Sequence, residues 1–207
     1  MARIHAGLSA AIAVSFLYFG AQLAAAPFFP GYSFLTDSAS LLGSDRSTLP
    51  LVLNTGAFLS GVAALAAAYG IAAALKQSGV RRIWIWLVAL SLVSTGAAAI
   101  WASLFHLPDP RHNPGMIGAG MFAVPIVLLA ALWSVSGARA IKVYLVINLV
   151  ALGVLILVMA GLTTIDLSRY GGLCQRFIAA VIYVPIGMVG WFLLRRLKQN
   201  LNMTQPT

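Results

Sequence analysis

Six long apolar segments, separated by shorter polar ones, most restrict what this chain can fold into. A helix that crosses the hydrocarbon core of a bilayer needs about 20 apolar residues, and each segment approaches or exceeds that length. Only 8% of the 207 residues are charged, whereas soluble globular proteins average about 25%. The pattern predicts an all-α integral membrane six-helix bundle, with one domain over residues 1–195 and a short tail over 196–207. The predicted spans are residues 8–29, 49–75, 83–105, 116–136, 143–165 and 177–194.

The first apolar segment also has some features of a secretory signal. Arg3 precedes it, and the small residues Ala24 to Ala26 could form a cleavage site. Pro27 follows directly, however, and the apolar stretch is long enough to cross a bilayer. We therefore expect an uncleaved first transmembrane helix.

Proline and glycine predict where the spans end or bend. Gly79 favours a helix stop after the second span, and three prolines within 106–115 argue against a helix there. Pro125 predicts a kink in the fourth span and Pro185 a kink in the sixth. The polar segment 166–175 is predicted to be the last loop.

The basic residues predict the orientation in the membrane. With six spans, both termini and two short turns share one side, which collects nine basic residues and no acid. The opposite side carries the other four arginines and all four aspartates. Cytoplasmic loops carry the excess of Lys and Arg, so both termini should be cytoplasmic. The net charge of +9 is then explained by membrane orientation and lipid headgroups, and no nucleic-acid partner is expected.

The longest polar interruption, residues 32–56, lies on the opposite, outer side and contains Asp37 and Asp45. His106 and His112 belong to the same side. This concentration of polar groups predicts an outer-face pocket for a lipid headgroup, a small ligand or a partner subunit. Its candidate residues are Asp37, Ser40, Asn54, His106, Asp109, His112 and Arg176.

One candidate for chemistry is the sequence His106-x-x-Asp109-x-x-His112. Two imidazoles and a carboxylate are ligand types of catalytic zinc and of non-haem iron, so a zinc or iron site is one hypothesis. The alternative is structural: His106 caps the third helix, and His112 is an interfacial polar residue.

The segment from Thr36 to Ser40 offers a second candidate, a serine nucleophile. Such a serine needs a base within hydrogen-bond reach, and His106 and His112 are the histidines on that side. The alternative is a capped turn, in which Asp and Ser side chains bond to nearby main-chain groups.

Arg176 directly precedes the sixth span, where a charge near hydrocarbon needs a partner. We expect it to pair with Asp37 or Asp109. Such a pocket could hold an anionic headgroup or a carboxylate, or the pair could simply lock the structure together.

Several classes of protein are disfavoured. Haem would need axial histidines within the spans, and retinal would need a mid-helix lysine; the sequence has neither. Phosphate-binding and dinucleotide-binding glycine motifs are absent. The spans contain no carboxylate, so an ion-coupled pump is also disfavoured.

Four stretches resemble landmarks of a family of six-helix membrane proteins from bacteria and archaea that is catalogued as a domain of unknown function. They are YSFLTDSASLLG, LVLNTGAFLSG, HLPDPRHNPGMIGAGMF and GGLCQRF. The resemblance implies a six-span protein of a bacterial or archaeal cell (inner) membrane with polar residues on its outer face. It draws attention to Ser40, Gly43, Asn54, Gly56, Asp109, His112 and Arg176.

The sequence departs from that pattern at one point, because Leu41 or Leu42 stands where an acid commonly precedes the Leu-Gly pair. A fainter similarity, used as analogy only, is to seven-helix membrane hydrolases that bind zinc through three histidines, one serine and one aspartate. The leading hypothesis is a non-enzymatic, or at least uncharacterised, membrane protein whose outer-face pocket binds a lipid headgroup, a small ligand or a partner subunit. The alternatives are a metal-dependent or serine hydrolase acting on a membrane-embedded substrate, and an accessory subunit of a larger membrane complex.

Overall fold

The computed structural model describes residues 1–203, and positions 204–207 of the predicted tail lie outside the described part. Six apolar helical segments are long enough to cross a membrane, as predicted, and the described residues contain no strand. The α-helices are α1 (Ala2–Ala25), α2 (Leu51–Gln77), α3 (Arg82–Leu104), α4 (Val124–Leu132), α5 (Arg139–Met159) and α6 (Leu167–Met203). Four 3-10 helices connect them: η1 (Ala26–Phe28), η2 (Ala39–Gly43), η3 (Pro110–His112) and η4 (Gly115–Ala123).

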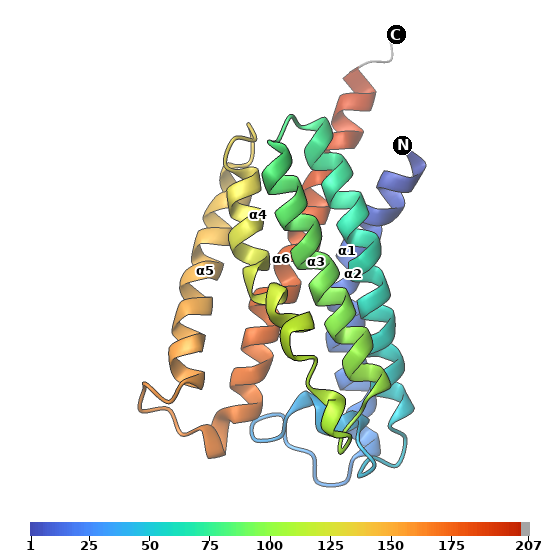
Figure 1. The fold of residues 1–207 in the computed structure, drawn as a ribbon, viewed down its shortest axis with the longest axis vertical. Coiled ribbons are helices and arrows are strands. Elements are labelled where there is room, and N and C mark those ends of the chain that lie inside the picture. Colours follow the sequence, from blue (N-terminus) through green and yellow to red (C-terminus); the bar gives the residue numbers. More distant parts are fainter. Residues whose placement is uncertain (204–207) are drawn as a thin grey trace.

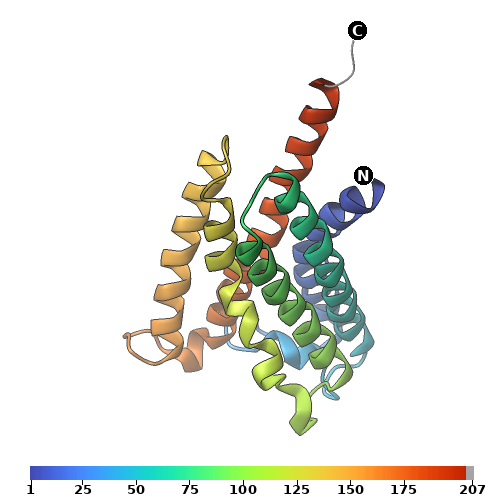
Figure 2. The ribbon, with the colours of Figure 1, turned by 45° about the horizontal axis from the view of Figure 1, so that its top comes forward.

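The helices run roughly parallel, with the start of α1 and the end of α6 at one end of the bundle (Figures 1 and 2). α1 packs on α2, α2 on α3, and α6 contacts α1, α2, α4 and α5. The segments 26–50 and 105–115 lie at the opposite end (Figure 1), which we call the loop-rich end. The shared position of these two helix ends fits an even number of spans. Their cytoplasmic location stays a prediction.

Glycines bring the first three helices unusually close together. A Cβ added to Gly7 of α1 would lie 2.7 Å from the Cα atom of Gly70 in α2. One added to Gly61 of α2 would lie 2.7 Å from the main-chain oxygen of Gly96 in α3. Helices in lipid associate through close van der Waals packing of this kind, because lipid chains are as apolar as the side chains they would replace.

The structure confirms the helix end that Gly79 predicted after the second span. α2 stops at Gln77, and Gly79 has a φ of 74°, a left-handed conformation that glycine adopts without strain. Val80 then donates from its main-chain N–H to Leu75 O at 3.1 Å, which satisfies a carbonyl at the helix end.

The last predicted loop is wrong, because residues 167–175 belong to α6. Asp166 accepts hydrogen bonds at Oδ1 from Ser168 N at 2.9 Å and from Ser168 Oγ at 2.6 Å. A carboxylate at this position caps the free N–H groups of a first helical turn, and the polar residues that follow are compatible with helix. The predicted tail is helical as far as Met203.

The fourth span also differs from the prediction of a kinked α-helix. It begins with η4, a 3-10 helix of 9 residues, and Pro125 lies in the first turn of α4. A proline is tolerated there because the N–H that it lacks has no partner in the first turn. The bend expected at Pro125 is instead a change from 3-10 to α geometry.

Candidate binding cavity at the loop-rich end of the bundle

A cavity of about 500 Å³ lies among α1, α2, α3 and α6 near the loop-rich end. Its apolar wall consists largely of small or medium side chains, including Ala57, Ala99, Ala102, Ala179 and Ile182. Its polar lining residues are Tyr18, Gln22, Ser38, Ser40, Asn54, Ser103, His112, Asn113, Gln175 and Tyr183. Three of the predicted site residues, Ser40, Asn54 and His112, therefore meet at one cavity.

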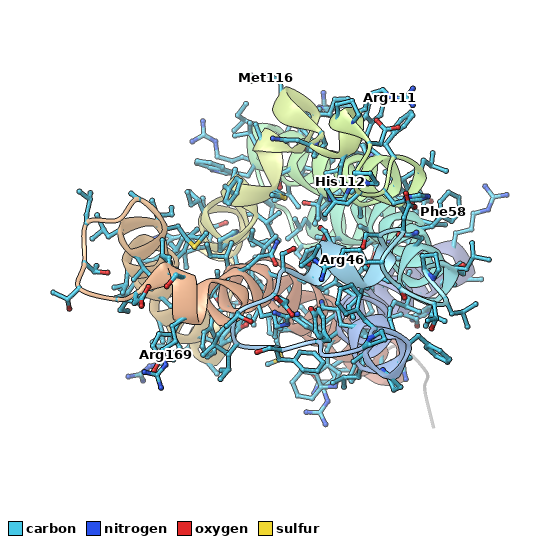
Figure 3. All side chains as sticks on the ribbon, turned by 90° about the horizontal axis from the view of Figure 1, so that it is seen from below. Arg46, Phe58, Arg111, His112, Met116 and Arg169 are labelled. Atoms are coloured by element: carbon cyan, nitrogen blue, oxygen red, sulfur yellow. The ribbon has the colours of Figure 1, made fainter. Side chains whose placement is uncertain are left out.

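Ser40 and His112 are in direct contact across this cavity wall. The Nε2 atom of His112 lies 2.9 Å from Ser40 Oγ, and its Nδ1 atom lies 2.8 Å from the main-chain oxygen of Phe105. A carbonyl oxygen can only accept, so Nδ1 carries the hydrogen and Nε2 accepts from the serine hydroxyl. Seen from the loop-rich end, His112 lies over the interior of the bundle, whereas Arg111 and Met116 lie at its edge (Figure 3).

Residues from two helices hold the serine in place. Gln175 of α6 accepts at Oε1 from the main-chain N–H of Ala39 at 2.9 Å. Asn54 of α2 donates from Nδ2 to the main-chain oxygen of Gly43 at 3.0 Å. These bonds hold both ends of η2, so α2 and α6 set the position of Ser40 together with bonds within the first loop, such as that from the Tyr32 hydroxyl to Ser38 O at 3.0 Å.

The Arg176 guanidinium bonds mainly to main-chain oxygens through Nη1, whereas its buried Nε has no hydrogen-bond partner among the described residues. Its Nη1 donates to Gly172 O at 2.8 Å, Asp37 O at 2.9 Å and Phe34 O at 3.0 Å, while Nη2 donates to the Tyr32 hydroxyl. The predicted ion pair with Asp37 or Asp109 is wrong. The first loop offers carbonyls in a geometry that one guanidinium can bind, which a sequence does not reveal.

The Asp37 carboxylate has local partners instead. It accepts from Ser33 N at 2.9 Å and from Thr36 Oγ1 at 3.4 Å, as the capped-turn alternative proposed. Burial raises the pKa of the Tyr32 phenol above its ordinary value, although Arg176 acts to lower it. The phenol is therefore neutral, and it shares the Arg176 guanidinium with main-chain oxygens rather than with a carboxylate.

His106 and Asp109 lie outside the cavity lining. His106 Nδ1 is 3.7 Å from Asp45 Oδ1, and both side chains are well exposed. Asp109 accepts from Arg111 Nη2 at 2.7 Å and from its main-chain N–H at 2.8 Å, and these hydrogen bonds lower the pKa of Asp109 to about 2.

The residues of the zinc or iron hypothesis are thus each engaged elsewhere: His106 by Asp45, Asp109 by Arg111 and His112 by Ser40. Within residues 1–203, no three His, Cys, Asp or Glu side chains gather closely enough to hold a metal ion. The hypothesis therefore has no ligand cluster to support it in the described chain.

The cavity lining also includes polar residues that are not among the predicted site residues. Gln22 of α1 is 2% exposed, and it was noticeable only as a polar residue inside a predicted span. Gln175 and Asn113 belong to segments that were predicted to be loops, and nothing in the sequence set them apart. Their role follows from packing that brings α6 and the segment after α3 together.

Comparison with known proteins identifies a family but no activity. A family model described as "Protein of unknown function (DUF998)" matches residues 12–192, nearly the whole apolar region. Comparison with curated proteins and with solved structures gives no match.

Proposed function

The chain belongs to the DUF998 family of proteins of unknown function, and we propose that it binds an uncharged lipid ester in the cavity at its loop-rich end. Six apolar helices make it a multi-pass membrane protein, so lipids are the molecules that it meets at highest concentration. The observation that carries the proposal is the composition of the cavity wall, which is apolar over most of its area and polar around Ser40 and His112.

The size of the cavity supports a ligand of this kind. Small-molecule pockets usually enclose about 300–1,000 Å³ and combine apolar walls with a few polar groups that orient the ligand. The volume of about 500 Å³ suits part of a lipid, such as one acyl chain with its ester group, rather than a complete phospholipid.

The polar lining supports an uncharged ligand. It consists of hydroxyls, amides and one imidazole, and includes no Lys, Arg, Asp or Glu. Arg176, which the sequence suggested as a partner for an anionic headgroup or a carboxylate, or as a structural lock, donates to three main-chain oxygens and a phenol. Esters, amides and alcohols can bond to such a lining without leaving an unpaired charge in a low-dielectric cavity.

The experiment is a titration of purified, delipidated full-length protein with 1-oleoylglycerol, followed by native mass spectrometry. The variants Ala99→Leu and Ala102→Leu each fill part of the cavity. Ala140→Leu is the matched control, because Ala140 lies on the exposed face of α5 away from the cavity. We expect the wild type and the control to bind one lipid, and the cavity variants to bind at least tenfold more weakly.

Two outcomes would overturn the proposal. One is undiminished binding by folded Ala99→Leu and Ala102→Leu proteins, which would place the lipid on the outer surface. The other is binding of the anionic lipid phosphatidylglycerol in place of 1-oleoylglycerol with equal affinity, which would contradict an uncharged class of ligand. Circular dichroism and the unfolding temperature establish whether each variant is folded.

A further inference from the structure

We propose that Ser40 is a nucleophile and His112 its general base, so that the cavity hydrolyses the uncharged ester that it binds. This inference rests on the proposed binding function and adds a reaction to it. Its basis is the 2.9 Å contact between Ser40 Oγ and His112 Nε2 at the polar end of an apolar cavity.

The orientation of the imidazole is the one that this chemistry requires. A serine hydroxyl becomes nucleophilic when a neighbouring base accepts its proton, and that base works best when a third group fixes its tautomer. The main-chain oxygen of Phe105 holds the hydrogen on Nδ1 and leaves the lone pair of Nε2 on Ser40. A backbone carbonyl thus takes the orienting position that a carboxylate occupies in many serine enzymes.

Side-chain amides on the same cavity offer hydrogen-bond donors for a developing oxyanion. The Oδ1 atom of Asn113 is held by Gly115 N at 2.9 Å, and the Oε1 atom of Gln175 is held by Ala39 N at 2.9 Å. In both residues the amide oxygen is fixed by a main-chain group, so the NH₂ group remains as the donor. Preorganised donors of this type often supply the largest part of acyl-transfer catalysis.

The reaction balances with water as the second substrate. Ser40 Oγ attacks the acyl carbon while its proton passes to His112 Nε2, and that proton then leaves with the alcohol as the C–O bond breaks. Water attacks the acyl-serine, giving one proton to Nε2, and this proton returns to Ser40 Oγ as the carboxylic acid is released. The net reaction converts an ester and water into an acid and an alcohol.

The alternative is that this hydrogen bond only connects the first loop to η3. The two roles differ in the reactivity that they give to Ser40. A serine that serves as a tie reacts no faster than an ordinary alcohol, whereas an activated serine is phosphonylated by a fluorophosphonate. A general base typically contributes about 10²–10⁴-fold to such a rate.

The experiment treats full-length protein in nanodiscs with a long-chain alkyl fluorophosphonate and maps the modified peptide by mass spectrometry. We expect stoichiometric modification of Ser40, none of residue 40 in Ser40→Ala, and at least 100-fold slower modification in His112→Gln. Ser168→Ala is the matched control, because Ser168 is an exposed serine at the same end of the bundle outside the cavity lining, and we expect it to react like the wild type.

Parallel measurement of 1-oleoylglycerol binding separates the two proposals. Binding without modification of Ser40 in the wild type would overturn the hydrolase and leave the binding function standing. Modification of Ser40 without lipid binding would support the reactive pair and overturn the proposed ligand. Equal rates in the wild type and in folded His112→Gln would overturn the role of His112 as a base. The wild-type result decides the main question even when a variant fails to fold.

Discussion

The side chain of Asn148 in α5 donates a hydrogen bond from Nδ2 to the main-chain oxygen of Val181 in α6, at 2.7 Å. Val181 lies four residues before Pro185, which has no N–H to complete the helical hydrogen bond with that oxygen. Asn148 therefore supplies the donor that proline removes. Neighbouring helices commonly compensate for intramembrane prolines in this way.

The energetic coupling between Asn148 and Pro185 can be measured with a double-mutant cycle. We expect Asn148→Leu to lower the free energy of unfolding by about 1–2 kcal/mol, because the Val181 oxygen loses its donor. In a Pro185→Ala background the new N–H at residue 185 can bond to that oxygen, so Asn148→Leu should cost less. Reversible unfolding of the four proteins in mixed micelles provides the cycle, and additive effects would contradict the pairing.

The contacts of Arg176 predict that its loss destabilises the protein more than the loss of the Asp37 charge. Arg176→Ala removes the donor for three main-chain oxygens and should cost about 2–4 kcal/mol. Asp37→Asn should cost about 1 kcal/mol or less, since its main bond is to the Ser33 N–H. Arg169→Ala, at an exposed position of the same helix, should stay within about 0.5 kcal/mol of the wild type. Unfolding in detergent tests all three, and equal losses for Arg176→Ala and Asp37→Asn would indicate an ion pair instead.

The close approach of α1 and α2 predicts a strong effect of one methyl group. Gly70→Ala places a Cβ against the backbone of Gly7, with no flexible side chain that could move away. We expect a loss of about 1–3 kcal/mol, typical of overpacking. The control is Gly153→Ala in α5, where nothing lies within 4 Å of the added Cβ, and alanine should there be neutral or stabilising. Similar unfolding temperatures for the two variants would contradict the predicted contact.

The lowered pKa of Asp109 predicts that the folding stability decreases at acidic pH. Its hydrogen bonds with Arg111 lower its folded-state pKa to about 2, below the value of about 3.9 expected in the unfolded chain. The contribution of this pair to stability is therefore fully present above about pH 4 and is lost as the pH falls towards about 2. Carbon-13 NMR of the Asp109 carboxyl should give a midpoint near the folded value, and Arg111→Gln should raise it. A wild-type midpoint near 4 would contradict the pairing.

The sequence was sufficient for the six spans, because span length is a local property, and three of its candidate site residues, Ser40, Asn54 and His112, line one cavity. It was insufficient for the cavity, which depends on how α1, α2, α3 and α6 pack. It also mispredicted Arg176: carboxylates are visible in a sequence, but a cluster of main-chain oxygens forms only when the first loop folds against α6.

The exact helix boundaries also depend on interactions that the sequence does not reveal. The segment 166–175 is polar enough to resemble a loop, yet Asp166 caps a helix that includes most of it. Pro125 predicted a kink because its position relative to the helix start was unknown. The serine and histidine hypothesis named two possible bases, and only the fold distinguishes His112, on Ser40, from His106, beside Asp45.

The 3-10 geometry of η4 affects the length of the fourth span. Nine residues of 3-10 helix rise about 18 Å, whereas the same residues in an α-helix would rise about 13.5 Å. A change to α geometry would therefore shorten this segment by about 4–5 Å along its helix axis. Because His112 lies three residues before η4, its height relative to Ser40 depends on which geometry the segment adopts. Bilayer thickness, which favours one span length over another, would act on the separation of these two side chains through any such change of geometry.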